Sequence, residues 1–297
     1  MDIAGDRSYV GFAAPGGPVA VISARCSHMG ADLSSGCVRE GRLVCPLHSW
    51  EYAPDGKCVH VPAASGIPGF ARQQACPVET RGGHVFFFNR TVAAFPFPFF
   101  DGKTEDQLLA ARPFDLEVNT PWYLAAGNGF DVQHFQGAHD RTLTSVPAVD
   151  SPHPFAMRLE ASFGVTGRSL QDRLTRRLAG PGVTLTIENW GGNFLLVTAR
   201  LRRTTTRGMV SFIPMGGGRT RVRDLVWVER SRSSAARTLL DPWNAAIRRH
   251  FVRCFVQADV AALDGISVHP GRLIPADGSL RQFLTWLHTI QRDDPGP

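Results

Sequence analysis

Two short segments, Cys26-Ser27-His28 and Cys45-Pro46-Leu47-His48, decide how this chain of 297 residues is interpreted. Sixteen residues separate them, so two thiols and two imidazoles arrive as matched Cys/His pairs. Two Cys on one iron and two His on the other are the ligand set of one class of [2Fe–2S] cluster. Each pair can occupy the tip of its own hairpin loop, with the His edges facing outward to pass electrons. We therefore expect Cys26, His28, Cys45 and His48 to bind a [2Fe–2S] cluster.

A zinc site is the alternative for these four residues. Zinc also takes Cys and His, but its ligand pairs are usually spaced Cys-x2-4-Cys and His-x3-5-His, unlike the mixed pairs of this chain. The other four cysteines show no spacing typical of a disulfide framework, and reduced thiols in a cytosol fit them better. They are Cys37, Cys58, Cys76 and Cys254.

The composition favours a globular protein with two domains. Hydrophobic residues make up 43% of the chain and charged residues 20%, and a domain usually takes roughly 100 to 200 residues. The sequence has no uncharged apolar run of about 18 residues and no basic N-terminal region followed by an apolar core. We therefore expect a cytoplasmic protein without a membrane span. The net charge of +6 comes mostly from dispersed arginines, which argues against a nucleic-acid partner and suits an acidic electron donor.

The first third of the chain predicts an all-β module. Alternating residues and turn signals indicate strands over 9–14, 19–23, 38–44, 50–61, 75–79 and 84–89. A Pro/Phe-rich run at 95–100, followed by polar residues, is typical of a linker. We therefore predict two domains, 1-98 and 99-297.

A second informative segment, residues 128–139, reads Asn-Gly-Phe-Asp-Val-Gln-His-Phe-Gln-Gly-Ala-His. At 100° per residue, Asp131 and His134 lie within about 60° of each other and would share one face of a helix. His134 and His139 would diverge by about 140° on a straight helix, so both can bind one ion only if the helix bends or bulges. Gly137 is where such a break costs least. This spacing is typical of a non-heme iron site.

A third ligand is expected on a long helix over residues 236 to 264. Phe251 and Phe255 share an apolar stripe of this helix, and Asp259 lies about 40° from Phe255 on the same side. Asp264 would lie about 180° from Phe255, on the outer face. A carboxylate on a buried face needs a partner, and a metal ion is a good one. Asp259 is therefore our choice. Two His and one carboxylate leave positions on Fe(II) open for oxygen and substrate.

The residues around the first two segments resemble Rieske iron–sulfur domains. The resemblance rests on Gly30, Asp32-Leu33-Ser34, Gly36, Trp50, Gly56 and Cys58. Respiratory-type Rieske proteins carry two further cysteines that form a disulfide beside the cluster. This chain has Ala31 and Leu47 at those positions, so it resembles the low-potential ferredoxin and oxygenase branch. Rieske domains of oxygenases normally have additional lead-in strands, so we expect this domain to be short at its N-terminus.

Both motifs together resemble the alpha subunits of Rieske non-heme iron oxygenases of the aromatic-ring-hydroxylating type. In this family an Asn-x2-Asp-x2-His-x4-His segment supplies two His ligands to a mononuclear iron, and a later Asp supplies the third. The match falls on Asn128, Asp131, His134 and His139. It implies that His134 and His139 bind Fe(II) with Asp259. It also implies that Asp131 bridges to His48 of a neighbouring subunit in a ring-shaped homotrimer.

The fold class that the resemblance implies is α+β. The all-β Rieske domain would be followed by a helix-grip (START/Bet v1-like) catalytic domain, in which a curved antiparallel sheet wraps a long C-terminal helix and encloses a cavity. The pattern indicates strands over 154–165, 183–187, 193–201, 209–214 and 220–229, and a helix near 170–178. The tail 272–286 and the pair His134-Phe135 resemble the monooxygenase branch that acts on steroids and other large polycyclic substrates.

The function that follows is that of a terminal oxygenase. The resemblance implies O2 and electrons as co-substrates and monooxygenation of a hydrophobic, polycyclic small molecule; dealkylation, desaturation and ring closure use the same site in the family. A Gly-x-Gly-x-x-Gly fingerprint is absent from the sequence, so a separate ferredoxin or flavin reductase would donate the electrons. The alternative is a non-catalytic Rieske electron carrier or ligand-binding protein that has lost turnover.

Overall fold

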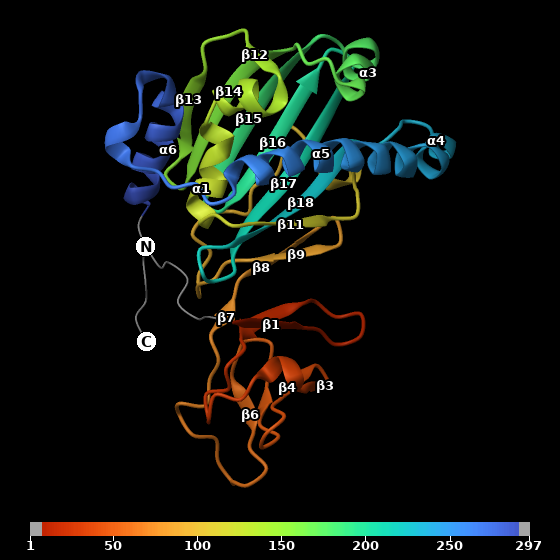
Figure 1. The fold of residues 1–297 in the computed structure, drawn as a ribbon. Helices are drawn as coiled ribbons and strands as arrows, with labels where there is room; N and C mark the ends of the chain where they lie inside the picture. Colours follow the sequence, from red (N-terminus) through yellow and green to blue (C-terminus); the bar gives the residue numbers. More distant parts are fainter. Residues whose placement is uncertain (1–7, 291–297) are drawn as a thin grey trace. The chain divides into compact units, whose positions relative to one another are not determined.

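The computed structural model describes residues 8–290 and divides the chain into two compact units between Phe97 and Pro98. Figure 1 shows the first unit in red to orange and the second in yellow-green to blue. The first seven residues of the predicted first domain lie outside the described part. Among the described residues, no helix combines the length and apolar character needed to cross a bilayer.

The first unit is built almost entirely from short antiparallel strands. One sheet has the order β1-β2-β7, a second β3-β4-β5-β6, and a third pairs β8 with β9. The 3-10 turn η1 (Leu33–Ser35) precedes the second sheet. The strands are β1 (Tyr9–Phe12), β2 (Ala20–Ser23), β3 (Cys37–Arg39), β4 (Arg42–Val44), β5 (Glu51–Tyr52), β6 (Cys58–His60), β7 (Ala75–Cys76), β8 (Val78–Arg81) and β9 (His84–Phe87).

Two glycines allow the close backbone contacts that this small unit needs. A Cβ on Gly36 would lie 2.1 Å from the carbonyl oxygen of Val44. Gly56 has a φ of +81°, and a Cβ there would lie 2.2 Å from the carbonyl oxygen of Gln73. Only glycine combines this conformation with so close an approach. The backbone around the β3–β6 sheet therefore requires glycine at both positions.

The composition of the Pro/Phe-rich run at 95–100 predicts a linker, but its aromatic side chains are packed against other rings. Phe95 and Phe97 pack on the aromatic rings of Phe88 and Phe86, with centroid distances of 5.0 and 4.9 Å. In the second unit, Phe99 contacts Trp227 edge-on at 5.5 Å. Aromatic side chains bury large areas, so this run contributes to the packing of the unit on each side of the boundary.

The second unit is a long antiparallel sheet with helices packed on it. The strand order is β10-β18-β17-β16-β15-β14-β12, with β11 also on β18 and β13 also on β14. All five strands predicted here and the helix near 170–178 are present. The strands are β10 (Leu108–Ala110), β11 (Phe114–Val118), β12 (Arg141–Leu143), β13 (Ala148–His153), β14 (Ala156–Val165), β15 (Gly182–Trp190), β16 (Phe194–Leu201), β17 (Thr204–Pro214) and β18 (Thr220–Glu229).

The helices of this unit lie mainly on one side of the sheet, and the longest, α5, crosses it (Figure 1). The apolar core between them includes Phe130, Phe163, Phe283 and Trp286, all buried. The helices and 3-10 turns are α1 (Trp122–Gly127), α2 (His134–His139), α3 (Leu170–Leu178), α4 (Ser234–Leu239), α5 (Asp241–Leu263), α6 (Gly278–Thr289), η2 (Glu105–Gln107), η3 (Asn128–Phe130), η4 (Pro270–Arg272) and η5 (Pro275–Asp277).

The prediction of one helix over 236–264 is wrong at its start. Two helices occupy this region, α4 and α5, with Leu240 between them. Pro242 lies at the first turn of α5; it has no amide hydrogen, and its ring would clash with the preceding turn of a continuous helix. The buried Asp241 accepts hydrogen bonds from the N–H and hydroxyl of Ser231, at 2.9 and 2.5 Å. These bonds fix the start of α5.

Candidate functional site

The two Cys/His segments of the first unit occupy two loops, each closed by antiparallel backbone pairing. In the first loop the N–H of Cys26 donates to the carbonyl of Ala31 at 2.9 Å. In the second, which joins β4 to β5, the N–H of Cys45 donates to the carbonyl of Trp50 at 2.8 Å. Both pairs therefore lie at loop tips, the arrangement expected from their spacing.

The side chains of these loops gather at one place. Cys26 and Cys45 are buried, and the exposed rings of His28 and His48 lie 4.8 Å apart between centroids. The His28 ring stacks on Trp50, with 4.4 Å between centroids and 5° between planes. Buried sulfurs below exposed imidazoles form a donor set of the right composition for a [2Fe–2S] cluster.

The groups around the sulfurs also fit a cluster. The hydroxyl of Tyr52 lies 3.1 Å from Sγ of Cys26. Burial raises the pKa of the Cys45 thiol, and the backbone N–H groups of Leu47 and His48 oppose this by hydrogen bonding to its sulfur. Such donors stabilise negative charge on metal-bound sulfur. The six cysteines of the chain are all free.

In the second unit, His134, His139 and Asp259 converge although they come from two helices. One ligand atom of each residue lies within 4.8 Å of the others. Oδ1 of Asp259 is 2.7 Å from Nε2 of His139 and 3.5 Å from Nε2 of His134. The carboxylate lies on α5 and both imidazoles on α2. Two imidazole nitrogens and one carboxylate oxygen are a donor set that suits Fe(II).

The helix geometry predicted around this site is wrong in two respects. Asp131 does not share a helix face with His134, because its φ of −86° and ψ of 95° are extended and place it before α2. Its Oδ1 instead accepts hydrogen bonds from the N–H groups of Gln133 and His134, at 3.0 and 3.3 Å. Helix α2 also runs through Gly137 without a break.

The imidazoles converge through the orientation of their side chains. Nδ1 of His134 hydrogen-bonds the carbonyl oxygen of Asp131. Since a carbonyl only accepts, Nδ1 carries the proton and Nε2 keeps a free lone pair that faces Asp259. Burial lowers the pKa of His134, against the opposing attraction of Asp259. The neutral ring is the form that binds a metal.

His139 is held by contacts that no sequence pattern predicted. Its ring stacks on Phe255, with 3.5 Å between centroids and 9° between planes. Nη1 of Arg141 donates to the carbonyl of His139 at 2.7 Å and forms an ion pair with Asp172 at 2.8 Å. No periodicity links these residues, because they come from four separate elements, α2, β12, α3 and α5.

The C-terminal helix supports the same segment from another side. The rings of Phe130 and Phe283 stack at 4.7 Å, and the hydroxyl of Ser279 donates to the carbonyl of Phe130 at 2.6 Å. Nε2 of Gln133 donates to Asp277 at 2.5 Å. The tail 272–286 therefore positions the residues on either side of Asp131.

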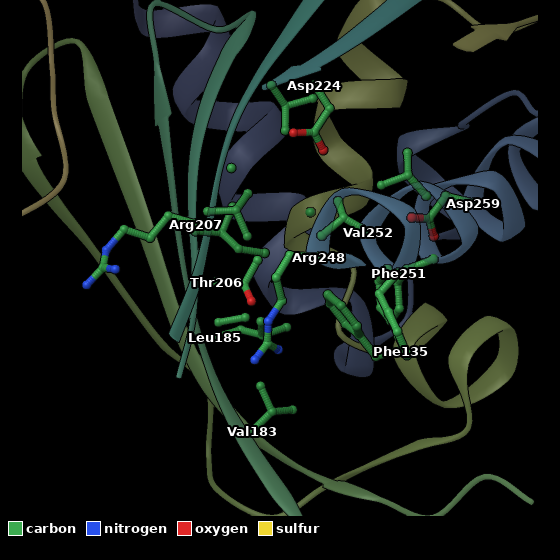
Figure 2. A pocket seen from close by; sticks show the side chains of 18 of the residues that line it. Phe135, Val183, Leu185, Thr206, Arg207, Asp224, Arg248, Phe251, Val252 and Asp259 are labelled. Atoms are coloured by element: carbon green, nitrogen blue, oxygen red, sulfur yellow. The ribbon is translucent and has the colours of Figure 1, made fainter. Parts of the chain in front are cut away.

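A large cavity of about 700 Å³ begins at this cluster and extends between the sheet and α5. His134, Asp259 and Asn128 line it, while most other lining residues are apolar. Figure 2 shows Asp259 on α5 near the apolar side chains of Phe251 and Val252. The apolar lining includes Phe135, Phe163, Val183, Leu185, Ile187, Leu195, Val197, Val210, Phe212, Val222, Phe251, Phe255 and Val260. A hydrophobic small molecule fits such a cavity.

Comparison with known proteins identifies a Rieske domain in the first unit. Residues 3–71 match the family model described as the Rieske [2Fe-2S] domain. The chain is 41% identical over 89 residues to the oxygenase component of 3-ketosteroid-9-alpha-monooxygenase from Mycolicibacterium smegmatis, covering 30% of this chain and 23% of that protein. It is 39% identical over 160 residues to cholesterol 7-desaturase nvd 1 from Ciona intestinalis, covering 54% and 30%. The chain thus spans less than a third of either relative.

The fold has a counterpart among solved structures. Apo dicamba monooxygenase superposes with a TM-score of 0.71 at 16% identity, over 96% of this chain and 89% of that chain. This similarity confirms the predicted fold class, an all-β Rieske domain followed by a domain with a long antiparallel sheet and a long C-terminal helix.

Proposed function

We propose that this chain belongs to the Rieske-domain aromatic-ring-hydroxylating oxygenase alpha subunits, the Rieske non-heme iron oxygenases, and that it is the terminal oxygenase of a multicomponent system. A separate ferredoxin or flavin reductase would supply electrons to a [2Fe–2S] cluster held by Cys26, His28, Cys45 and His48. The substrate would be oxidised in the cavity of the second unit.

One observation carries the proposal: His134, His139 and Asp259 converge at the wall of a large apolar cavity. An electron carrier has no use for a second donor set or for a cavity of about 700 Å³ beside it. Fe(II) held by these three residues would supply the activation of O2, since a facial triad leaves positions open. The apolar walls would exclude water and orient the substrate against the open side of the site.

The chain's own residues would prepare this site before substrate enters. Asp131 holds the His134 ring through its carbonyl and caps α2 through its carboxylate. Phe255 and Arg141 hold His139. Asn128, at the start of η3, lines the cavity beside them and would contact the substrate or Asp131.

We further propose a homotrimer in which the electron passes from His48 of one subunit by way of Asp131 of the next. Two observations support this route. His48 is exposed, so it is accessible to another molecule. The carbonyl oxygen of Asp131 accepts a hydrogen bond from Nδ1 of His134, and the residue is partly exposed. Asp131 would therefore connect the surface to an iron ligand through hydrogen bonds.

The reaction we propose is monooxygenation of a hydrophobic, polycyclic small molecule. The apolar cavity supports this class, and two relatives are named for acting on a 3-ketosteroid and on cholesterol. The second of these is named a desaturase, so removal of one hydrogen from each of two adjacent carbons, with formation of a C=C bond, is the second outcome to assay.

The test begins with iron and acid-labile sulfide per chain. The oxygenase should hold about three irons and two sulfides, and Asp259→Ala should lose about one iron while it keeps the sulfide and the visible spectrum of the cluster. Oxygen uptake with a surrogate reductase, over a panel of polycyclic compounds, then measures activity. Two irons per chain with no substrate-dependent uptake would favour the alternative of a carrier without turnover.

A further inference from the structure

Helix α5 presents two charged side chains to the cavity, Arg248 and Asp259. Arg248, Phe251, Phe255 and Asp259 recur at helical spacing and all line the cavity. Asp259 lies eleven positions after Arg248, which is about 16 Å along the helix axis at 1.5 Å per residue. The two aromatic rings lie between them. The guanidinium and the candidate iron ligands are therefore about three turns of α5 apart along one wall of the cavity.

Arg248 lacks the carboxylate partner that Arg141 and Arg207 of the cavity wall have. Its guanidinium is half-buried, and burial alone lowers its pKa, with no contribution from a carboxylate. Among the described side chains its hydrogen-bond partner is the hydroxyl of Thr204, at 2.7 Å. By contrast, Arg141 pairs with Asp172 at 2.8 Å, and Arg207 pairs with Glu229 at 3.2 Å.

A guanidinium in this position remains charged, because arginine does not lose its proton in proteins. A charge held away from water without a partner is unfavourable. A carboxylate would remove this cost and match the planar fork of Arg248 with two parallel hydrogen bonds. Figure 2 shows the Arg248 side chain extending from α5 toward Thr206 and Leu185 of the sheet, into the space that a ligand would fill.

Besides Asp259, the cavity is lined by one further acid, Asp224, and it forms no ion pair with Arg248 among the described residues. It lies on β18, is fully buried, and its Oδ1 has no hydrogen-bond partner among the described residues. Burial raises the pKa of Asp224 to about 7, and Arg248 does not oppose this. A neutral carboxyl repels an anion little and can donate a hydrogen bond to a ligand oxygen. Arg248 therefore lacks an anionic partner, and Oδ1 of Asp224 lacks a hydrogen-bond partner among the described residues.

We propose that the cavity takes an elongated apolar molecule that ends in a carboxylate, that Arg248 binds this carboxylate, and that Asp259 lies at the opposite end of the molecule. The inference rests on the proposed function, since it takes the end at Asp259 as the reacting end. It specifies that the substrate is an acid. The distance from the carboxylate to the oxidised carbon should be no more than about 16 Å, the rise along α5 between Arg248 and Asp259.

Lithocholic acid and its methyl ester test this proposal, because the two differ only in the charge at one end of an elongated polycycle. Binding to the holoprotein is measured by calorimetry without reductase. We expect the acid to bind the wild-type protein about 10- to 100-fold more tightly than the ester, the range for one charge-assisted contact. Arg248→Met should remove this preference and leave ester binding unchanged, which also shows that the variant is folded.

The matched control is Arg253→Met. Arg253 lies on the same helix and is exposed, away from the cavity. This variant removes the same charge and should keep the full preference for the acid. Equal binding of acid and ester to the wild-type protein, absence of binding, or an equal loss in both variants would overturn the inference.

The two proposals fail separately. Arg248-dependent binding of the acid without any oxygen uptake would leave this inference standing and reject the oxygenase. Oxygen uptake with neutral polycyclic compounds, unchanged in Arg248→Met and without preference for the acid, would leave the oxygenase standing and reject the role of Arg248.

Discussion

The ring of His139 lies flat on the ring of Phe255, with 3.5 Å between their centroids. Phe255 is one turn of α5 before Asp259, so one helix supplies both the carboxylate and the surface that orients the imidazole. The geometry of the candidate iron site therefore depends on an apolar side chain that offers no ligand atom.

The first prediction concerns this stacking. Phe255→Leu should free the His139 ring and weaken binding of the mononuclear iron about 10- to 100-fold, the usual cost of losing a residue that orients a ligand. Competition with a chelator measures the affinity. Phe251→Leu is the control, since Phe251 also lines the cavity from α5 but contacts neither imidazole among the ring pairs described. Equal losses in both variants would contradict an orienting role.

The second prediction separates two roles of Asp131. Asp131→Asn keeps an oxygen that can cap α2 but removes the negative charge, whereas Asp131→Ala removes both. If Asp131 carries the electron route, both variants should slow re-oxidation of the reduced cluster by O2 and substrate at least about 10-fold. Stopped-flow absorbance measures that rate. A normal rate of re-oxidation in Asp131→Asn would show that Asp131 has only a structural role at the start of α2.

The third prediction concerns the pH dependence of stability. Burial raises the pKa of Asp224 to about 7 from 3.8, so the folded protein holds this proton more tightly than the unfolded chain. The stabilising contribution is complete below pH 3.8 and is lost as the pH rises through about 7. Between these two pH values, roughly three units apart, the contribution of Asp224 to the free energy of unfolding changes by up to about 4 kcal/mol.

Asp224→Asn should remove this dependence. The variant should gain stability over the wild-type protein at pH 8 and show little gain at pH 4, measured by urea unfolding of the second unit. Asp115→Asn is the control, because the Asp115–Arg223 hydrogen bond lowers the pKa of Asp115 and reverses the sign. Parallel pH profiles for Asp224→Asn and the wild-type protein would show that Asp224 is ionised when buried.

The fourth prediction concerns the backbone of the cluster domain. Gly56→Ala places a Cβ 2.2 Å from the carbonyl oxygen of Gln73 at a φ of +81°. The variant should lose at least about 2 kcal/mol of stability and bind less cluster, measured by visible absorbance per chain. Gly66→Ala is the control, because nothing lies within 4 Å of its Cβ position. Full cluster content in both variants would contradict this requirement.

The sequence predicts those features that depend on spacing within one segment. The strand pattern of the first unit and the two Cys/His loops follow from turns and alternation. Helical phase also separates Asp259 from Asp264: Asp259 reaches the imidazoles, whereas Asp264 lies past the end of α5. The iron and cluster roles of these residues stay predictions.

Features that depend on tertiary contacts were not predictable in this way. Asp131 departs from helical geometry because its own carboxylate caps α2. The local sequence pattern predicts neither the ion pair of Arg141 with Asp172 nor the lack of a counterion at Arg248. Both depend on which strand or helix faces the residue after folding.

The contacts of α6 have a consequence for assembly. Its residues Ser279 and Phe283 hold Phe130, just before Asp131, yet α6 is synthesised after every other helix and strand described. On the ribosome, the segment that carries both imidazoles would therefore lack its packing partner until synthesis reaches α6. The strands around the Cys/His loops have no such dependence. Maturation should then be sequential, with the cluster domain able to mature during translation and the mononuclear site formed only after α6 has emerged.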